Sequence, residues 1–328
     1  MSCGKKRLLV VGGAGYIGSH MVKWLARQDC EVTTLDDFST GFAEAVRYGE
    51  LVTGSIADPI ALDQLFAAKQ FGAVMHFASF IQVGESVKDP ARYYRNNFSN
   101  TQNLLDAMVR HGVKRFIFSS SAAVFGEPLY TPIDERHALN PINPYGRSKL
   151  MVEQMLEDYD HAYGLKSYAL RYFNAAGADS EGELGERHEP ETHLIPLVLQ
   201  AANRRRDAIT VFGTDYDTPD GTCIRDYIHI QDICAAHWLS LQQLMQGAPS
   251  ARYNLGNGSG FSVREVIDVA ERITCRSVPV IYGPRRPGDP ARLVADAALA
   301  RKILGWQPRY ADLETIVRHA WEWEIKAG

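Results

Sequence analysis

Two residues at the start of a predicted helix carry side chains that could move a proton. The stretch 141-PINPYGRSK-149 places Tyr145 and Lys149 four residues apart, so that both side chains lie on one helical face. The pKa of a phenol, near 10, would have to fall by about 3, worth ~4 kcal/mol, for it to act as a base at neutral pH. A neighbouring ammonium favours that change. From the spacing alone, a surface contact explains the pair better.

Hydroxyl side chains at the end of a predicted strand favour the chemical interpretation. The run 118-FSSSAAVFG-126 begins as an apolar strand and ends in three serines, the last of them Ser121. In open α/β sheets the ligand lies outside the carboxyl ends of the parallel strands. A weak acid, a cation and a hydroxyl group are therefore predicted near a ligand.

A glycine-rich turn near the N-terminus indicates a second ligand group. In 10-VVGGAGYIGSH-20 the glycines Gly12, Gly15 and Gly18 follow a predicted strand and open a predicted helix. Missing side chains let the backbone approach a pyrophosphate at the positive end of that helix. Asp36 closes the next strand, where it would bind ribose hydroxyls and repel a 2′-phosphate. The pattern predicts NAD rather than NADP, against the alternative of a tight turn that binds nothing.

A sheet must position these residues, and the hydrophobic pattern predicts one. Short apolar runs alternate with segments of helical period up to about residue 180, which predicts a Rossmann-like, doubly wound parallel sheet of the α/β class. The strands are predicted at 8–12, 31–36, 51–55, 73–78, 115–121 and 167–174, and the helices at 15–28, 60–69, 90–111 and 144–163.

Beyond residue 180 the pattern changes to charged and turn-rich segments between shorter apolar runs. We predict a smaller, discontinuous C-terminal α/β lobe for substrate, with the ligand between the lobes. Residues 1–178 form the predicted NAD-binding domain, with later returns near 226–258, and residues 179–328 form mainly the second lobe. Strands are expected near 227 and 252, and helices before Met245 and after Ser262. The 321-WEWE-324 run is expected to dock a terminal helix.

Bulk properties narrow the class of protein. The chain has 328 residues and a net charge of -4, which does not suggest nucleic acid as a partner. Its five cysteines show neither a disulfide framework nor a zinc-ligand spacing, so no metal site is predicted. No apolar run reaches the ~18 residues of a membrane helix, and the first strand leaves no room for a signal peptide. We therefore expect a cytoplasmic protein with small molecules as partners.

Six further blocks follow the glycine turn in order, and together with it they are spread over about 275 residues. They are 76-HFAS-79 with 83-VGES-86, FSSSAAVFG, PYGRSK, 171-RYFNAAGA-178, 220-DGTCIRDYIH-229 and 285-RRPGD-289. With the glycine turn, these blocks resemble the UDP-glucose 4-epimerases, a family of extended short-chain dehydrogenase/reductases. The resemblance implies interconversion of UDP-galactose and UDP-glucose through a transient 4-keto sugar.

The resemblance also implies the roles of individual residues. Tyr145 would take the proton of the sugar 4-hydroxyl, Ser121 would bond the same oxygen, and Lys149 would bind the nicotinamide ribose and lower the tyrosine pKa. The implied cofactor contacts are Gly12, Gly15, Tyr16, Ile17, Gly18, Asp36, Asp37, Ser39, Thr40, Ser55, Ile56, Phe77, Ala78, Ser79, Asn96, Ser119, Tyr145, Lys149 and Tyr172. The implied substrate contacts are Ser121, Tyr145, Asn174, His193, Leu194, Val211, Phe212, Arg225, Tyr227, Arg286 and Asp289.

Three positions depart from residues found in some family members. Ser55 replaces an adenine-binding Asp, Ile81 replaces a lysine near the cofactor, and His193 replaces an Asn. Leu293 stands where the family sets room around the sugar 2-substituent, so UDP-N-acetylhexosamines and UDP-pentoses remain alternative substrates.

The sequence also bears on other activities of related enzymes. Dehydration needs a further acid and base, and the corresponding positions hold Ala122 and Ala123, whose methyl groups cannot transfer protons. Decarboxylation of a UDP-uronic acid and a non-catalytic, NAD-sensing role on the same fold remain as alternatives.

The long helices predicted at 90–111 and 144–163 carry more apolar residues than one core-facing stripe needs. A larger core of the chain itself is one explanation. The family commonly pairs such helices in a four-helix interface, and we therefore predict a homodimer. The residues concerned are Tyr93, Phe98, Leu105, Met151 and Met155.

Overall fold

A computed structural model describes residues 6–286 and 289–327, which leaves Cys3 and the Pro287–Gly288 pair of the RRPGD block outside the described residues. The chain divides into two compact units, each treated by itself below. Unit 1 contains residues up to 126, 139–171 and 234–253, and unit 2 contains residues 127–138, 172–233 and 254 onward.

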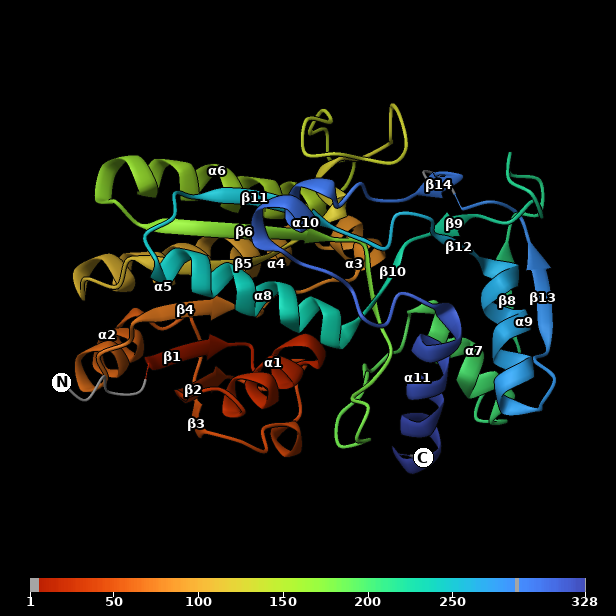
Figure 1. Cartoon of the computed structure of the whole chain (residues 1–328), viewed down its shortest axis with the longest axis horizontal. Coiled ribbons are helices and arrows are strands. Elements are labelled where there is room, and N and C mark those ends of the chain that lie inside the picture. The colour runs from red at the N-terminus through yellow and green to blue at the C-terminus, as the bar shows by residue number, and fades with distance from the viewer. Residues whose placement is uncertain (1–5, 287–288, 328) are drawn as a thin grey trace. The chain divides into compact units, whose positions relative to one another are not determined.

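A seven-stranded sheet belongs to unit 1, in the order β11-β6-β5-β4-β1-β2-β3 (Figure 1). The pairs β1–β2, β2–β3, β1–β4 and β4–β5 are parallel. All six strands predicted before residue 180 are present, and the strand expected near 252 completes the sheet. Their bounds are β1 (Lys6–Val11), β2 (Cys30–Asp36), β3 (Glu50–Thr53), β4 (Ala73–His76), β5 (Arg115–Ser121), β6 (Lys166–Tyr172) and β11 (Ala251–Leu255).

Helices cover this sheet because their apolar faces match its buried strands. Side chains of α2 (Pro59–Ala68), α5 (Asn100–Arg110) and α6 (Pro144–Tyr163) form one core with the central strands. The helix α1 (Tyr16–Ala26) packs on β1 and β2. On α8 (Ile230–Met245), the His237 ring lies 5.0 Å from that of Phe77, just after β4. The short helices α3 (Val83–Lys88) and α4 (Pro90–Tyr93) pack beside α6.

The predicted helix 90–111 is helical throughout but changes its winding. It consists of α4, a π-helical segment at Tyr94–Ser99, and α5. Asn97 lies buried in the π segment, where its side chain accepts from the Phe80 backbone N–H at 2.9 Å and donates to the Phe80 carbonyl at 3.0 Å. We attribute the changed winding to this anchoring, because π segments often occur where a side chain must be re-aimed.

Local sequence explains why α6 begins and ends where it does. The Asn143 side chain accepts from the Gly146 N–H at 2.8 Å, and Pro144 occupies the first turn, where its missing N–H is not needed. Gly164 ends the helix with a positive φ of 67°. These signals place Tyr145 and Lys149 in the first two turns.

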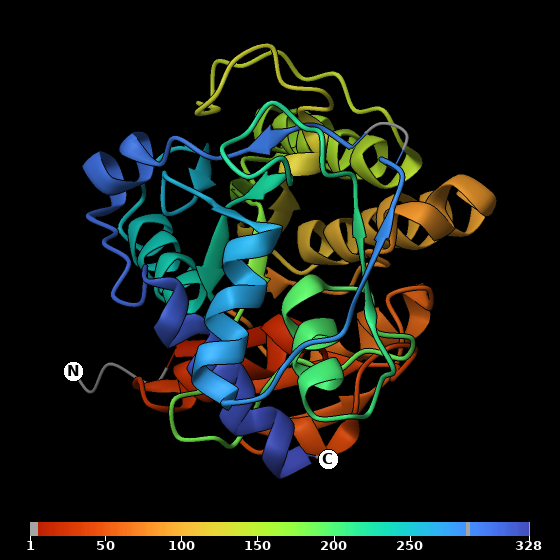
Figure 2. The same ribbon diagram turned by 90° about the vertical axis from the view of Figure 1, so that its right-hand side faces the viewer.

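Unit 2 is a smaller α/β assembly with short strands. Its sheets are β10-β7, β12-β9-β14 and β13-β8. The strands are β7 (Asn174–Ala176), β8 (Ile209–Phe212), β9 (Ile224–Arg225), β10 (Tyr227–His229), β12 (Phe261–Ser262), β13 (Val280–Gly283) and β14 (Arg292–Leu293). The helices α7 (Leu194–Ala202), α9 (Val263–Thr274) and α11 (Leu313–Ala327) pack against one another around a second core (Figure 2), and α10 (Ala298–Leu304) completes the unit.

The strand near 227 and the helices before 245 and after 262 are confirmed. Trp323 of α11 donates its indole N–H to the Glu186 carbonyl at 3.2 Å, which confirms that the terminal helix docks through the WEWE run. The strands β7, β9, β12, β13 and β14 were not predicted, because two to four residues are too few to show a period.

None of the helices in the described part of the chain combines the length and the apolar character that crossing a bilayer requires.

Candidate functional site

The glycine turn between β1 and α1 contains glycines of two kinds. At Gly12, which has φ +80°, an added Cβ would lie 2.4 Å from the Ala78 backbone N, and at Gly18 it would lie 2.1 Å from the Gly12 carbonyl. The packing of the chain itself therefore requires both. At Gly15 the nearest atom would be the Gly12 carbonyl at 3.5 Å. The missing side chain of Gly15 instead leaves room above the N-terminus of α1, where an anion is stabilised.

Asp36 holds this turn to the end of β2. Its two carboxylate oxygens accept backbone N–H groups from Ala14 and Phe38, each at 2.8 Å. Burial raises the pKa of this carboxyl, and the two backbone hydrogen bonds oppose that rise. Each oxygen has a second lone pair. Asp36 can therefore still accept hydroxyl donors, as the predicted ribose contact requires.

The neighbouring carboxylate is tied to Ser55. The Ser55 hydroxyl donates to Asp37 at 2.8 Å, and the Ser39 N–H donates to the other oxygen of Asp37 at 3.0 Å. Although burial works in the opposite direction, these hydrogen bonds lower the pKa of Asp37. The departure at Ser55 thus has a structural partner. Thr40 is exposed in the same loop, and Ile56 is buried below it.

Most of the remaining predicted cofactor residues lie at or just after the carboxyl ends of strands of the sheet. Phe77, Ala78 and Ser79 come directly after β4, and Tyr172 is the last residue of β6. Tyr16 and Ile17 open α1, and Ser119 lies near the end of β5. Asn96 lies in the π segment and donates to Asn97 at 3.0 Å. Ile81, the departure from a lysine, is 38% exposed.

Lys149 is buried and forms two hydrogen bonds to residues near the neighbouring strand ends. Its ammonium donates to the Ser79 hydroxyl at 2.8 Å and to the Ser119 carbonyl at 2.9 Å. Burial lowers the pKa of Lys149 to about 7, against a smaller opposing effect of the Glu153 carboxylate. Its nitrogen lies 5.9 Å from the centre of the Tyr145 ring.

Ser121 lies close enough to Tyr145 for its side chain to interact with the phenol. An added Cβ at Gly146 would lie 2.3 Å from the Ala123 carbonyl, so this glycine lets the start of α6 approach the turn after β5. Burial raises the pKa of the Tyr145 phenol, and the Ser121 hydrogen bond offsets part of the rise. The chain by itself does not make this phenol acidic. The predicted lowering of its pKa therefore requires further positive charge at the site.

Sequence reasoning missed Glu153, one helical turn after Lys149. Its fully buried carboxylate accepts from the Ser120 hydroxyl at 2.6 Å and pairs with Arg171 at 2.5 Å and with Arg252 at 3.0 Å. Arg171 in the middle of the apolar strand 167-SYALRY was an available signal, because a buried arginine requires a buried partner.

The residues of unit 1 fit NAD. Gly15 leaves space at a helix N-terminus, Asp36 offers acceptors for ribose hydroxyls, and the residues directly after β2, Asp37 and Phe38, offer no cation for a 2′-phosphate. Ser121, Tyr145 and Lys149 come together beside these groups, at the carboxyl ends of the central strands.

Apart from Ser121 and Tyr145 of unit 1, the predicted substrate residues lie in unit 2, and several of them are brought together. Asn174 of β7 pairs with Tyr227 of β10, and its side-chain amide donates to the Asp226 carbonyl at 3.1 Å. The guanidinium of Arg225 is ion-paired with Asp289 and donates to the Pro290 carbonyl at 2.9 Å. Arg225 therefore pairs with Asp289 rather than with Asp226.

The Asp226 carboxylate instead accepts backbone N–H groups from Asn257, Gly258 and Ala295. Arg286 lies over the ring of Phe212, at 3.9 Å from its centroid.

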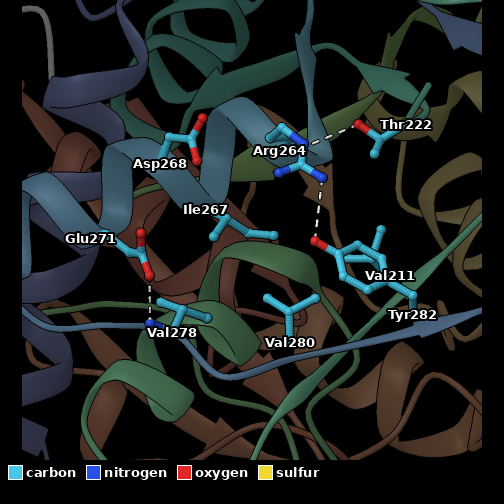
Figure 3. A pocket seen from close by; sticks show the side chains of 9 residues that line it. All are labelled: Val211, Thr222, Arg264, Ile267, Asp268, Glu271, Val278, Val280 and Tyr282. Carbon is cyan, nitrogen blue, oxygen red and sulfur yellow. Dashed lines mark hydrogen bonds between the residues drawn. The ribbon is translucent and has the colours of Figure 1, made fainter. Parts of the chain in front are cut away.

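Val211 is separated from Phe212 by strand alternation. It is buried and lines a cavity of about 170 Å³ between α9 and β13 (Figure 3). There Arg264 donates to the Tyr282 hydroxyl at 3.2 Å. Of the predicted substrate residues only Val211 lines this cavity, so its side chain does not share the face on which Phe212 meets Arg286.

His193 lies at the N-cap of α7, directly before Leu194. Its Nδ1 lies 2.9 Å from a Glu186 oxygen and 3.2 Å from a Glu191 oxygen. Although burial works in the opposite direction, these carboxylates raise the pKa of His193 to about 10. The sequence left the charge of His193 undecided. In the metal-free protein its imidazole is therefore positively charged at neutral pH.

Known proteins share this architecture over nearly the whole chain. The model of the NAD dependent epimerase/dehydratase family matches residues 8–256. A UDP-glucose 4-epimerase of Rhizobium meliloti (strain 1021) is 50% identical over 319 residues, covering 97% of this chain and 97% of the relative.

Solved structures agree. The UDP-glucose 4-epimerase from Brucella ovis in complex with NAD has a TM-score of 0.95 and 52% identity, covering 96% of this chain and 97% of that one. The UDP-glucose 4-epimerase from Bifidobacterium longum in complex with NAD+ and UDP has a TM-score of 0.91 and 36% identity, covering 98% of both chains. By its sequence, its sheet and its glycine turn, the chain belongs to the NAD dependent epimerase/dehydratase family and, within it, to the UDP-glucose 4-epimerases.

Proposed function

We propose that this protein interconverts UDP-galactose and UDP-glucose, with Ser121, Tyr145 and Lys149 as its catalytic residues. The observation that carries the proposal is the contact of the Tyr145 phenol with Ser121, beside a buried Lys149 ammonium and next to a turn that fits NAD. Family membership favours this activity over the NAD-sensing alternative and over dehydration.

Tyr145 accepts the proton of the sugar 4-hydroxyl and later returns it. Ser121 bonds the same sugar oxygen and relays the proton, because its side chain lies beside the phenol. NAD, when bound, supplies the acceptor and then the donor for the hydride of C4. The 4-keto sugar turns between the two transfers, so that the hydride returns to the opposite face and no net oxidation occurs.

Lys149 contributes fixed positive charge next to the phenol. Burial disfavours both the phenolate and the ammonium when each is alone, but each charge stabilises the other. The positive nicotinamide ring adds to the same field. Tyr145 is therefore a base only in the assembled site.

Residues of unit 2 hold the UDP group in this proposal. Arg225 and Arg286 bind the diphosphate, because the planar guanidinium offers paired donors to phosphate oxygens. Asp289 and Asn174 bind the ribose and the sugar-diphosphate, Phe212 packs along uracil, and His193, Leu194 and Tyr227 shape the site, whereas Val211 lines the separate cavity beside α9. Leu293 lies in β14 opposite Arg225, and it leaves open whether UDP-N-acetylhexosamines or UDP-pentoses are also accepted.

The test is conversion without added reductant. Purified protein is incubated with UDP-galactose and with other UDP sugars, without added NAD, and the products are separated while co-purified NAD is measured. We expect UDP-glucose from UDP-galactose. In Tyr145→Phe we expect a rate at least about 10³-fold lower, within the range for loss of a general base, with NAD retained.

A matched control keeps this test specific. Tyr130→Phe removes the hydroxyl of an exposed tyrosine that donates to Asp134 at 2.7 Å, and it should leave the rate unchanged. Full activity of Tyr145→Phe would refute the base assignment. A folded wild-type protein that holds NAD but converts no UDP sugar would favour the NAD-sensing alternative.

The proposal includes a cytoplasmic location and a homodimer through the helices at 90–111 and 144–163. Four cysteines in the described part of the chain, Cys30, Cys223, Cys234 and Cys275, are free thiols, which suits a reducing compartment. Exposed apolar residues beside α6 support the dimer. Val83 is 45% exposed and Val87 63% exposed on α3, and α3 packs against α6.

A further inference from the structure

Four potential metal ligands converge in the loop that leads into α7. We call them the His–Glu cluster, and they are Glu186, His188, Glu191 and His193. Each contributes one nitrogen or carboxylate oxygen, and these atoms all lie within 4.8 Å of one another. The four residues lie within eight positions of the chain, all in unit 2.

Four nitrogen–oxygen separations within the cluster, which use both oxygens of Glu191, are close to those between ligand atoms of a four-coordinate ion. The Nδ1 of His188 lies 3.5 Å from a Glu186 oxygen and 3.4 Å from a Glu191 oxygen. The Nδ1 of His193 lies 2.9 Å and 3.2 Å from oxygens of the same two glutamates. A tetrahedral zinc ion with bonds of about 2.05 Å separates its ligand atoms by about 3.3 Å.

Further hydrogen bonds hold the two glutamates of the cluster in place. Glu191 accepts the backbone N–H groups of Thr192 at 2.7 Å and of His193 at 2.9 Å, both on the same carboxylate oxygen. Trp323 donates to the carbonyl of Glu186 at 3.2 Å. Such outer contacts orient the ligands of metal sites.

The buried carboxylates of the His–Glu cluster require a compensating positive charge. The side chains of Glu186 and Glu191 are only 7% and 6% exposed, so two carboxylates lie close together with little water to screen them. Protonated imidazoles can supply the charge, and so can a divalent ion. The 40% exposure of the His193 side chain leaves an entry path for that ion.

We propose that the His–Glu cluster is a structural zinc site, which cross-links the loop 186–193 up to the N-cap of α7. Two imidazole nitrogens with two carboxylate oxygens favour a borderline ion such as Zn²⁺ over Mg²⁺ or Ca²⁺, which prefer oxygen ligands alone. All four positions are filled by the chain, so the ion has no open position for substrate and takes no part in epimerisation.

The experiment measures metal binding, and it does not depend on activity. The purified NAD-containing protein is analysed for metal, dialysed against a chelator and titrated with Zn²⁺ by calorimetry and with Co²⁺ by visible absorption. We expect one ion per chain, the intense Co²⁺ spectrum of four-coordinate sites, and a higher melting temperature with Zn²⁺.

Variants assign the ion to the cluster. His188→Ala should weaken Zn²⁺ binding at least about 100-fold, since even outer contacts are worth 10–100-fold. His161→Ala, which removes an exposed histidine at the end of α6, should bind like wild type. If His188→Ala does not fold, Glu186→Gln, which keeps the side-chain shape, takes its place.

Two results would overturn the proposal. One is a folded wild-type protein that binds no Zn²⁺ and shows no four-coordinate Co²⁺ spectrum, in which case the cluster is an ion-pair network only. The other is Zn²⁺ binding that His188→Ala or Glu186→Gln leaves unchanged, since the ion would then lie elsewhere.

Discussion

Lys149 shows at the scale of one residue how the fold prepares a side chain for chemistry. In an unfolded chain a lysine titrates near 10.4, whereas burial lowers the pKa of Lys149 to about 7 in the folded protein. Its two hydrogen bonds, to Ser79 and to the Ser119 carbonyl, fix the nitrogen in place. The site therefore holds a cation that burial destabilises until compensating groups are present.

This burial predicts a pH dependence of stability. Between about pH 7 and pH 10 the unfolded chain keeps the Lys149 proton that the folded chain has released, so raising the pH favours the folded state. We measure the free energy of unfolding of NAD-free protein in urea. Between pH 7 and pH 9 we expect it to rise in wild type by on the order of 2 kcal/mol more than in Lys149→Met.

The comparison with Lys149→Met removes the contributions of all other titrating groups. An unfolding free-energy difference that stays constant over this range would show that Lys149 titrates normally in the folded protein.

At the scale of elements, Glu153 connects one helix to three adjacent strands. Its carboxylate on α6 meets Ser120 on β5, Arg171 on β6 and Arg252 on β11, which are neighbours in the order β11-β6-β5. Because α6 also carries Tyr145 and Lys149, this network fixes the catalytic helix on the sheet. Arg171 is buried, with 1% exposure, and would lose its main charge partner without Glu153.

We predict that Glu153→Gln lowers the free energy of unfolding by roughly 3–5 kcal/mol, as is usual when a buried ion pair loses one member. Denaturant unfolding measures this. Adding Arg171→Met should recover part of the loss, since it removes the unpaired charge. Glu31→Gln breaks the exposed Arg7–Glu31 pair and should change stability by less than about 1 kcal/mol. A similar loss in both single variants would refute the special role of Glu153.

At the scale of the whole molecule, fewer apolar residues are exposed to support the proposed dimer than the sequence pattern suggested. Tyr93, Leu105 and Met155 are buried within the chain itself. Only Phe98 and Met151 of the five apolar residues are partly exposed. The exposed residues Val83 and Val87, four apart on α3, add an apolar face beside α6.

We therefore predict that Val87→Glu converts a dimer to a monomer, because it places a charge in an interface that excludes water. Light scattering after size-exclusion chromatography measures the mass. Ile60→Glu changes a residue of α2 that is 71% exposed, and it should leave the mass unchanged. A wild-type monomer would contradict the dimer itself, and a dimeric Val87→Glu would place the interface elsewhere.

Sequence alone was sufficient where one short segment contains the whole signal. The strands before residue 180 alternate with helices of clear period, and α6 is bounded by Asn143 and Gly164, so their positions could be read locally. The glycine turn with Asp36, and the pair Tyr145 and Lys149, carry their meaning in spacing and residue type. The family follows from the same ordered blocks.

Only the tertiary structure decided which distant residues meet. It joined Glu153 to Arg171 and Arg252, paired Arg225 with Asp289, and placed Val211 apart from Phe212. The His–Glu cluster lies within one short segment, but only the fold brings its four side chains together. The physical reason is that burial, charge compensation and ligand geometry depend on distances in space, whereas the sequence specifies only order and local period.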